Sequence, residues 1–289
     1  MEPLTKKIKI AVITGPTATG KTALAVELAK EFSGEIISVD SRQVYRGMDI
    51  GSGKDLAEYG DIPYHLIDIA DPAADTYNLF EFCSDAFAAI EDISRRGKLP
   101  ILCGGTALYL NAILQGYNLP GGKLPERRTG EARIRQEGTE AAFVPPFELD
   151  ALVMGVYFPR KTVRARIEAR LDARFASGMI EEVKALHEKG VSYEKLEFFG
   201  LEYREISRYL QNLCSFEEMR LTLLNRIRQF AKRQDIFFRK MERENINIYW
   251  LNEGKEPDPR KLLRDFLSGS ALPEIGFKLS EHHNAPSYK

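Results

Sequence analysis

The chain has 289 residues, of which 41 are Lys or Arg, 42 are Asp or Glu and 44% are hydrophobic. This balance is typical of a folded protein with a buried core and excludes a disordered tail or a fibre. No stretch approaches the roughly 18 consecutive apolar residues of a membrane helix, and the N-terminus lacks a signal-peptide cleavage site. We therefore expect a cytoplasmic protein without a membrane partner. The net charge of −1 gives no sign of a nucleic-acid partner, and the three scattered cysteines argue against disulfides and a zinc site.

Short apolar runs alternate with longer amphipathic segments along the chain. The runs predict strands at 8–14, 35–39, 99–103, 151–157 and 246–251. The segments between them predict helices at 22–32, 78–96, 106–114, 163–189 and 216–243. Buried strands separated by helices favour a mainly parallel sheet that is covered on both faces. The predicted fold class is α/β, with a helical C-terminal half.

Composition divides the chain into four parts. Residues 1–115 form the first part of the core, and 151–267 form its remainder together with two basic helices. Between them, 116–150 is rich in Pro, Gly and charge, which indicates a linker or a small excursion from the sheet. Residues 268–289 show little periodicity and are expected to be a flexible tail.

The strongest motif lies between the first predicted strand and the first predicted helix. It has the full Walker A spacing: Gly15, Pro16, Thr17, Ala18, Thr19, Gly20, Lys21 and Thr22. The glycines let backbone N–H groups turn toward phosphate oxygens, the helix N-terminus and Lys21 add positive charge, and Thr22 can ligate Mg²⁺. The alternative is an ordinary glycine-rich turn. The motif predicts a P-loop core but does not tell which polyphosphate it binds.

Asp40 follows the second predicted strand, at the sheet edge where open α/β sheets place their ligands. A carboxylate there can ligate Mg²⁺, act as a general base or cap the following turn. Gln43 offers a donor and an acceptor that suit an adenine edge. After the strand at 99–103, Gly104 and Gly105 lead to Thr106, whose hydroxyl either caps the next helix or faces the ligand.

Positive charge is concentrated on two predicted helices. Residues 220–243 contain eight basic and two acidic residues. A second run consists of Arg160, Lys161, Arg164, Arg166, Arg170 and Arg174. Charged helix faces are usually solvated surface, but a local excess of this size in a balanced chain also indicates contact with phosphates.

The chain resembles the tRNA dimethylallyltransferases, also called tRNA isopentenyltransferases, in motifs that follow the family's order: GPTATGKT, DSRQVYRGMDIGSGK, PYHLID, GKLPILCGGTALYLNAIL, RARIEARLDARFASGMIEEV and RIRQFAKRQDIFFRK. The match is close over 8–116 and looser over 160–243. This resemblance implies transfer of a dimethylallyl group from its diphosphate to N6 of the adenosine next to the anticodon of tRNA, with Mg²⁺. It also suggests a monomer.

The resemblance also assigns roles to residues. The P-loop, residues 15–22, would hold the diphosphate of the prenyl donor, with Thr22 as the Mg²⁺ ligand. Asp40 would be the general base, Thr106 would lie beside the diphosphate, and Arg228 would neutralise the leaving group. Contact with the tRNA and its adenine would come from Asp40, Ser41, Arg42, Gln43, Lys54, Lys232 and Arg233.

Three departures from the family pattern stand out. The family carries a helical insertion that helps to hold the anticodon stem, and 116–150 is too short to contain it. Second, the family's GTxK reads Gly51-Ser52-Gly53-Lys54 and its PHHLID reads PYHLID at 63–68. Third, its GYKE segment reads GLEYRE, and Ile227 replaces a threonine. We therefore expect that the catalytic pocket is retained and that the protein makes fewer contacts with RNA. Fewer contacts would weaken tRNA binding or move it onto the two basic helices.

Other functions are also compatible with these motifs. A prenyltransferase that acts on a free adenine nucleotide such as AMP would not need the insertion. A small-molecule P-loop kinase also fits a Walker A motif with a strand-end carboxylate, but it should have an Arg-rich lid and bind ATP. Retention of Lys21, Thr22, Asp40, Thr106 and Arg228 argues against a non-enzymatic RNA-binding relative.

Overall fold

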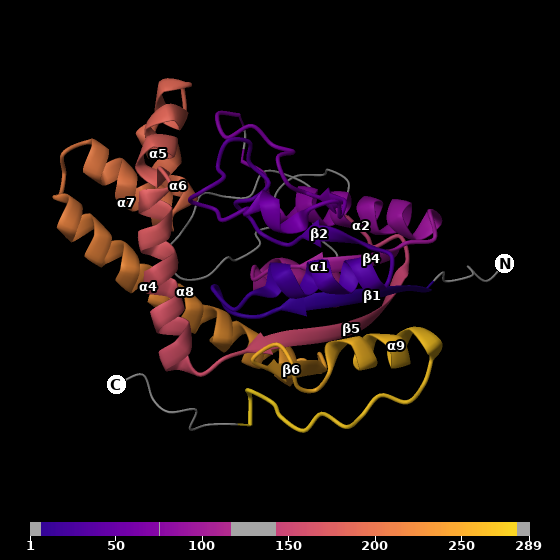
Figure 1. The fold of residues 1–289 in the computed structure, drawn as a ribbon. Coiled ribbons are helices and arrows are strands. Elements are labelled where there is room, and N and C mark those ends of the chain that lie inside the picture. Colours follow the sequence, from indigo (N-terminus) through magenta and orange to yellow (C-terminus); the bar gives the residue numbers. More distant parts are fainter. Residues whose placement is uncertain (1–6, 75, 117–142, 282–289) are drawn as a thin grey trace.

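The computed structural model of the chain describes residues 7–74, 76–116 and 143–281. In these ranges a twisted sheet is flanked by helices, and a further layer of helices stands across one end of it (Figure 1). None of the helices in the described ranges is long and apolar enough to cross a membrane.

The sheet is parallel throughout its described strands. Their order across the sheet is β3-β2-β4-β1-β5-β6, and each neighbouring pair is parallel. The bounds are β1 Lys7–Thr14, β2 Gly34–Ser38, β3 Tyr64–His65, β4 Leu99–Cys103, β5 Glu148–Tyr157 and β6 Ile248–Asn252. The prediction of an α/β fold with a mainly parallel sheet is confirmed.

Helices cover both faces of the sheet because successive side chains of a strand point to opposite sides. Ile10 and Val12 of β1 pack on α2 (Leu79–Arg95), α3 (Ala107–Leu114) and the end of α8 (Phe216–Arg243). Ala11 and Ile13 pack on the other face, against α1 (Lys21–Glu31) and α9 (Pro259–Ser268). The short 3₁₀ helix Leu56–Tyr59 extends this second core.

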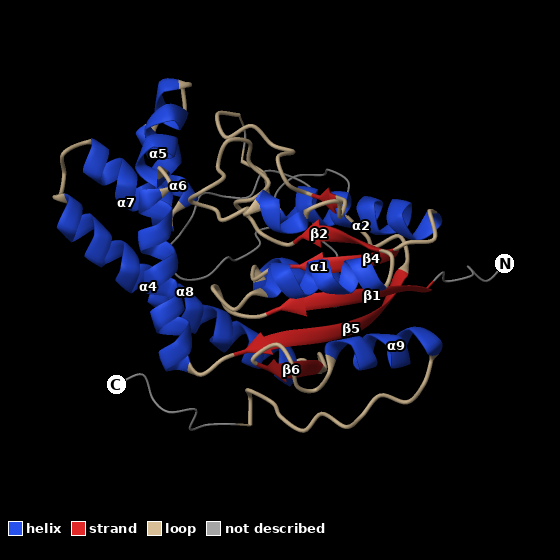
Figure 2. Ribbon diagram, viewed as in Figure 1, coloured by secondary structure: helices blue, strands red, loops and turns tan. Residues whose placement is uncertain are grey.

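The helical layer lies at the carboxyl ends of the strands, toward which the arrowheads point in Figure 2. It contains α4 (Arg160–Ala176), α5 (Met179–Glu188), α6 (Tyr193–Phe199), α7 (Leu201–Leu210) and most of α8. Its core includes Val44, Tyr45 and Met48 from the loop that follows β2. This loop therefore joins the sheet to the helical layer.

Several elements differ from the sequence-based expectations. The single helix predicted at 163–189 is two helices, because Gly178 has a left-handed φ of 94° and separates α4 from α5. The short helices α6, α7 and α9 and the two-residue β3 were not predicted. Strand β5 begins at Glu148, inside the expected linker. Residues 117–142 of that linker lie outside the described residues.

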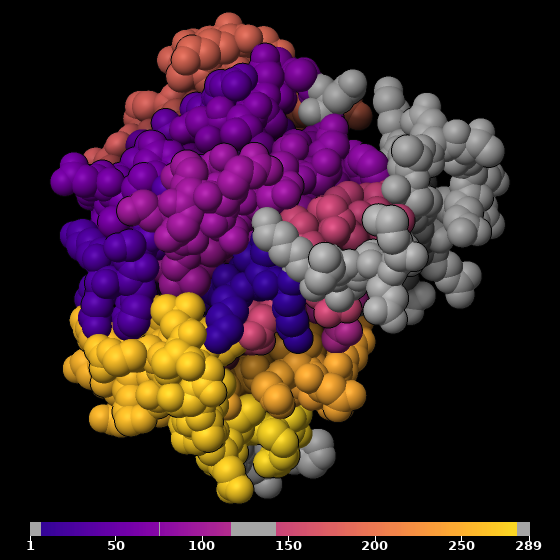
Figure 3. Space-filling view, turned by 90° about the vertical axis from the view of Figure 1, so that its right-hand side faces the viewer, coloured from indigo at the N-terminus to yellow at the C-terminus, as the bar shows by residue number. Residues whose placement is uncertain are grey.

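The described part of the expected tail packs against the body of the protein. Leu279 is buried, and the carboxylate of Glu242 on α8 accepts hydrogen bonds from the backbone N–H groups of Leu279 and Ser280 at 3.0 and 2.6 Å. In Figure 3 the C-terminal segment, in yellow, lies along the lower end of the molecule. Residues 282–289 lie outside the described ranges, and the four-part division of the chain stays a prediction.

Candidate functional site

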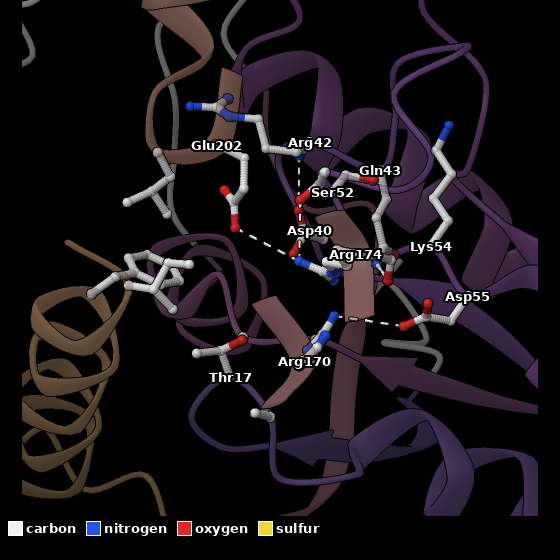
Figure 4. A pocket seen from close by; sticks show the side chains of 18 of the residues that line it. Thr17, Asp40, Arg42, Gln43, Ser52, Lys54, Asp55, Arg170, Arg174 and Glu202 are labelled. Atoms are coloured by element: carbon white, nitrogen blue, oxygen red, sulfur yellow. Dashed lines mark hydrogen bonds and ion pairs between the residues drawn. The ribbon is translucent and has the colours of Figure 1, made fainter. Parts of the chain in front are cut away.

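A large cavity lies between the carboxyl ends of the strands and the helical layer (Figure 4). Its volume is about 1340 Å³. The loops after β1, β2 and β4 line one side of it, and α4, α7 and α8 line the other. The Walker A motif, Asp40 and Thr106 all contribute to its wall, so the structure brings together the three motifs that the sequence singled out.

The Walker A residues form the expected loop between β1 and α1. Gly15 has a left-handed φ of 141°, and a side chain there would meet the carbonyl oxygen of Val156 at 2.7 Å. Gly20, with φ 80°, is the residue before the first turn of α1. The Thr19 hydroxyl donates to the Pro16 carbonyl at 2.9 Å and keeps the loop turned back on itself. Backbone N–H groups at such a helix start attract anions.

Lys21 supplies the positive charge of the loop. Its ammonium group donates a hydrogen bond to the Pro16 carbonyl at 2.7 Å. Burial, together with the nearby charge of Arg170, lowers the pKa of Lys21 to about 8, although Cys103 and Asp40 act in the opposite direction. A bound phosphate would stabilise the charged form. Thr22, the next residue, also lines the cavity.

Asp40 fills one of the roles that the sequence left open, that of a cap, and it also lies at the cavity. One carboxylate oxygen accepts a hydrogen bond from the Arg42 backbone N–H at 2.8 Å and so caps the turn after β2. The same side chain lines the cavity and is only half-buried. A carboxylate fixed through one oxygen is well placed to accept a proton from a bound group.

Thr106 is connected to this turn. It occupies the N-cap position of α3, yet its side chain makes no capping hydrogen bond to that helix. Its hydroxyl oxygen instead accepts a hydrogen bond from the Ser41 N–H at 3.3 Å. Gly104 permits this approach, because a side chain there would lie 2.1 Å from the Val39 carbonyl oxygen. Thr106 therefore ties the turn after β4 to the turn after β2 at the cavity wall.

Gln43 and Lys54 are held by other parts of the protein. The Gln43 amide accepts from the Ser38 hydroxyl at 2.7 Å and donates to the Gly53 carbonyl at 2.9 Å. The side chain of Lys54 is 1% exposed, and its ammonium donates to Asp49 at 2.6 Å and Asp68 at 2.5 Å. Both residues line the cavity but have structural partners, so this geometry favours a role in shaping the loop. Their predicted contact with RNA stays a prediction.

Gln234 of α8 is a site residue that the motif analysis missed. Its side chain is buried, accepts a hydrogen bond from the Thr17 N–H at 3.0 Å and donates to the Gly105 carbonyl at 2.8 Å. A signal existed in the sequence. Helical spacing places Gln234 on the same buried stripe as Ala231 and Phe238, where a polar residue needs a specific partner.

The two basic helices meet at the cavity, as their charge suggested. Its wall includes basic residues of α4 and α8: Arg166, Arg170, Arg174, Arg226 and Arg233. Arg42 and Arg204 lie on the wall as well. Lys232 is exposed, and the residues that line this cavity do not include it.

Arg228 takes a different position from the one its proposed role would suggest. Its guanidinium donates to Glu168 on α4 at 2.8 Å, and it lines a second, smaller cavity together with Arg160 and Asp235. Arg228 and Arg233 are five residues apart, which is not a whole number of helical turns. They therefore point to different sides of α8. The role of Arg228 at the leaving group stays a prediction.

The family models and the relatives that match this chain all describe isopentenyl or dimethylallyl transferases. A family model described as IPP transferase matches residues 43–145 and 127–241, and one described as isopentenyl transferase matches residues 8–59. The chain is 44% identical to tRNA dimethylallyltransferase 1 of Geotalea uraniireducens (strain Rf4), over 91% of this chain and 98% of the relative. It is 43% identical to the tRNA dimethylallyltransferase of Treponema pallidum (strain Nichols), over 83% and 90%.

The chain belongs to the tRNA dimethylallyltransferase family. A solved member, the full-length tRNA isopentenylpyrophosphate transferase from Bacillus halodurans, is 30% identical and superimposes with a TM-score of 0.72. That comparison covers 91% of this chain and 96% of the other. The family resemblance inferred from the motifs is therefore confirmed.

The chain lacks residues that its Geotalea relative has. The alignment with the Geotalea protein extends over 301 residues, more than the 289 of this chain, although it includes only 91% of the chain. The relative therefore has residues without a counterpart here. The IPP transferase model matches in two pieces that overlap at 127–145. Both findings agree with the shortened insertion that the sequence predicts within 116–150.

Proposed function

We propose that this protein transfers a dimethylallyl group from dimethylallyl diphosphate to N6 of an adenosine next to the anticodon of tRNA. The observation that carries this proposal is the meeting of the P-loop, Asp40 and Thr106 in one cavity, in a member of the tRNA dimethylallyltransferase family. We further propose that it acts in the cytoplasm as a monomer.

The P-loop is the proposed site for the diphosphate of the donor. Residues 17–22, which include the start of α1, line the cavity, and Lys21 adds a positive charge. As the allylic C–O bond breaks, negative charge grows on the departing diphosphate. Groups that are already oriented toward that charge lower the barrier, because they need not reorganise during the reaction.

Asp40 is the proposed general base. The new bond forms between N6 of the adenine and the first carbon of the dimethylallyl group, while the bond from that carbon to the diphosphate oxygen breaks. The nitrogen then loses a proton, which the Asp40 carboxylate accepts. The Arg42 N–H holds one carboxylate oxygen in place, and Thr106 holds the neighbouring backbone through Ser41.

Mg²⁺ fits this cavity as an ion that is bound chiefly through the substrate. Among the described residues no group of three or more His, Cys, Asp or Glu could hold a metal. Mg²⁺ commonly takes few protein ligands and completes its shell with water and phosphate oxygens. Thr22 would hold it together with the diphosphate, and the ion would neutralise part of the diphosphate charge.

The size of the cavity favours a large acceptor. Its volume of about 1340 Å³ exceeds the ~300–1,000 Å³ that is typical of small-molecule sites. The donor and an adenosine that remains part of an RNA chain can therefore occupy it together. A free adenine nucleotide is the second candidate acceptor, because it would not need the insertion that the sequence predicts to be shortened.

The test is incubation of the purified protein with labelled dimethylallyl diphosphate and Mg²⁺, with unmodified tRNA in one sample and AMP in another. We expect label in tRNA. Label only in AMP would support the second candidate, and label in neither would contradict both. A parallel sample with labelled ATP and no prenyl donor tests for kinase activity.

A further inference from the structure

Two arginines lie side by side on the cavity wall formed by α4. Arg170 and Arg174 are four residues apart, so they occupy the same face of the helix. Both press against Gly53: a side-chain carbon at that glycine would lie 2.2 Å from Nη2 of Arg170 and 1.7 Å from Nη2 of Arg174. The two nitrogens are therefore less than 4 Å apart. Figure 4 shows both side chains among those of Asp40, Asp55 and Glu202.

Their acidic neighbours lie beyond hydrogen-bonding distance. Arg170 faces Asp55 and Arg174 faces Glu202, each at 3.6 Å, which is longer than a hydrogen bond. The Asp55 side chain is also 51% exposed. Nη1 of Arg174 donates to the Gly51 carbonyl at 3.3 Å. Its Nη2 is buried and has no hydrogen-bond partner among the described residues.

We propose that Arg170 and Arg174 together bind a phosphate group at a second anion site in the cavity, and that this phosphate belongs to the RNA backbone beside the target adenosine. The inference rests on the proposed function. Two guanidinium groups held next to each other present several N–H donors in planar forks, a geometry that matches phosphate oxygens. A phosphate would also separate and neutralise the two like charges.

Three observations favour the RNA backbone over the diphosphate of the donor. The P-loop already offers the donor a helix start and Lys21 on the opposite wall. The exposed Arg166 continues the positive charge of α4 along the same cavity. Finally, the sequence predicts a shortened insertion, so contacts to RNA are expected from the two basic helices.

The burial of Arg170 is consistent with an anion-binding site. It lowers the pKa of Arg170, and the charge of Arg174 lowers it further, whereas Asp55, Glu202 and Asp40 raise it. A bound phosphate would favour the charged form of Arg170.

A purely structural role is the competing explanation, because both arginines also contact the loop at 51–55. Glu182 of α5 provides a matched control, since it holds the same loop from the other side. Its carboxylate accepts hydrogen bonds from the backbone N–H groups of Asp49, Ile50 and Gly51. Glu182→Gln loosens the loop without removing a positive charge from the cavity.

The experiment measures binding of a fluorescent anticodon stem-loop RNA by anisotropy over a series of KCl concentrations. It compares the full-length wild type with Arg170→Gln, Arg174→Gln and Glu182→Gln, after circular dichroism has shown that each is folded. Each arginine variant should bind the RNA about tenfold more weakly and reduce the slope of log K against log [salt] by about 1. The Kd for dimethylallyl diphosphate should not change. Arg174→Lys replaces Arg174→Gln if that variant does not fold, and should bind with intermediate affinity.

A second RNA carries an uncharged methylphosphonate at each of the two phosphates that flank the target adenosine, in turn. At one of these two phosphates, the modification should weaken RNA binding by the wild type about as much as Arg174→Gln weakens binding of the unmodified RNA. The same modification should not weaken RNA binding by Arg174→Gln any further. Weaker binding of the donor with unchanged RNA binding would assign the pair to the diphosphate and overturn the proposal. Equal effects of Arg174→Gln and Glu182→Gln without a change of salt slope would show a structural role.

Wild-type prenyl transfer is measured separately. Intact salt-dependent RNA binding without transfer would count against the proposed function while leaving the phosphate site standing.

Discussion

Gln234 accepts a hydrogen bond from the backbone N–H of Thr17 at 3.0 Å and thereby joins helix α8 to the P-loop. The other end of the same amide donates to the Gly105 carbonyl at 2.8 Å. One buried side chain therefore fixes two glycine-containing turns that come from distant parts of the sequence. Because both turns line the cavity, the position of α8 determines the shape of the proposed diphosphate site.

Gln234→Leu should reduce both stability and turnover. The substitution leaves the Thr17 N–H and the Gly105 carbonyl without their partner, which costs about 1–3 kcal/mol for each buried group left unsatisfied. Urea denaturation measures the loss of stability, and steady-state kinetics should show a raised KM for the donor. Gln211→Leu is the control, because the Gln211 amide donates within its own helix to the Ser207 carbonyl. Equal effects of the two substitutions would contradict the proposed coupling.

The local parts of the site could be predicted from the sequence, and the parts that depend on tertiary packing could not. The P-loop is a continuous segment whose glycines carry its geometry, so it connects β1 to α1 as the motif predicts, and residues 17–22 line the cavity. The role of Gln234 depends on how α8 crosses the sheet, which no local pattern encodes. The motif also could not show that Asp49 and Asp68 bind the buried ammonium group of Lys54, whose contact with RNA stays a prediction.

The same distinction applies to the fold. Long amphipathic segments such as 216–243 were predicted with the bounds that α8 has. Gly178 was not recognised as the break between α4 and α5, because a single glycine within an amphipathic pattern is compatible with one continuous helix. Strand β3 has two residues and depends on pairing with β2, so it carries almost no periodic signal of its own.

Asp40→Asn should abolish most of the transfer without weakening donor binding. Asparagine retains an oxygen that can accept the hydrogen bond from the Arg42 N–H, so the turn should persist. It cannot act as a base at neutral pH, and loss of a general base typically costs about 10²–10⁴-fold in rate. Single-turnover kinetics measures the rate, and calorimetry measures donor affinity. Unchanged turnover would remove Asp40 from the mechanism.

Donor binding should weaken as the pH rises above about 8. Burial lowers the pKa of Lys21 to about 8 in the free protein, so its ammonium group loses its proton near that pH. The diphosphate prefers the protonated form, and the Kd should therefore rise by up to about tenfold for each pH unit above the pKa. Titration of dimethylallyl diphosphate at several pH values measures this.

Lys21→Arg is the matched variant for the pH experiment. Arginine keeps its charge throughout the accessible range, so the alkaline loss of affinity should disappear even if the affinity itself is lower. Persistence of the same pH dependence in this variant would show that another group is responsible.

Glu182→Gln should destabilise the fold by about 1–3 kcal/mol, the cost of weakening hydrogen bonds to a charged acceptor. Its carboxylate accepts from three successive backbone N–H groups and from the Tyr203 hydroxyl at 3.0 Å. Tyr203→Phe removes one of these bonds and should cost less. Guanidinium denaturation of both variants gives the comparison, and a larger loss for Tyr203→Phe would contradict this description of the loop anchor.

The most direct test of the central claim is mass spectrometry of tRNA after reaction with the purified protein, dimethylallyl diphosphate and Mg²⁺. Nuclease digestion followed by fragment sequencing locates the modified nucleoside. We predict that one adenosine beside the anticodon gains the mass of a single dimethylallyl group on N6, and that Asp40→Asn leaves the tRNA unmodified. Unmodified tRNA with the wild-type protein, or a prenyl group on another kind of nucleoside, would contradict the account.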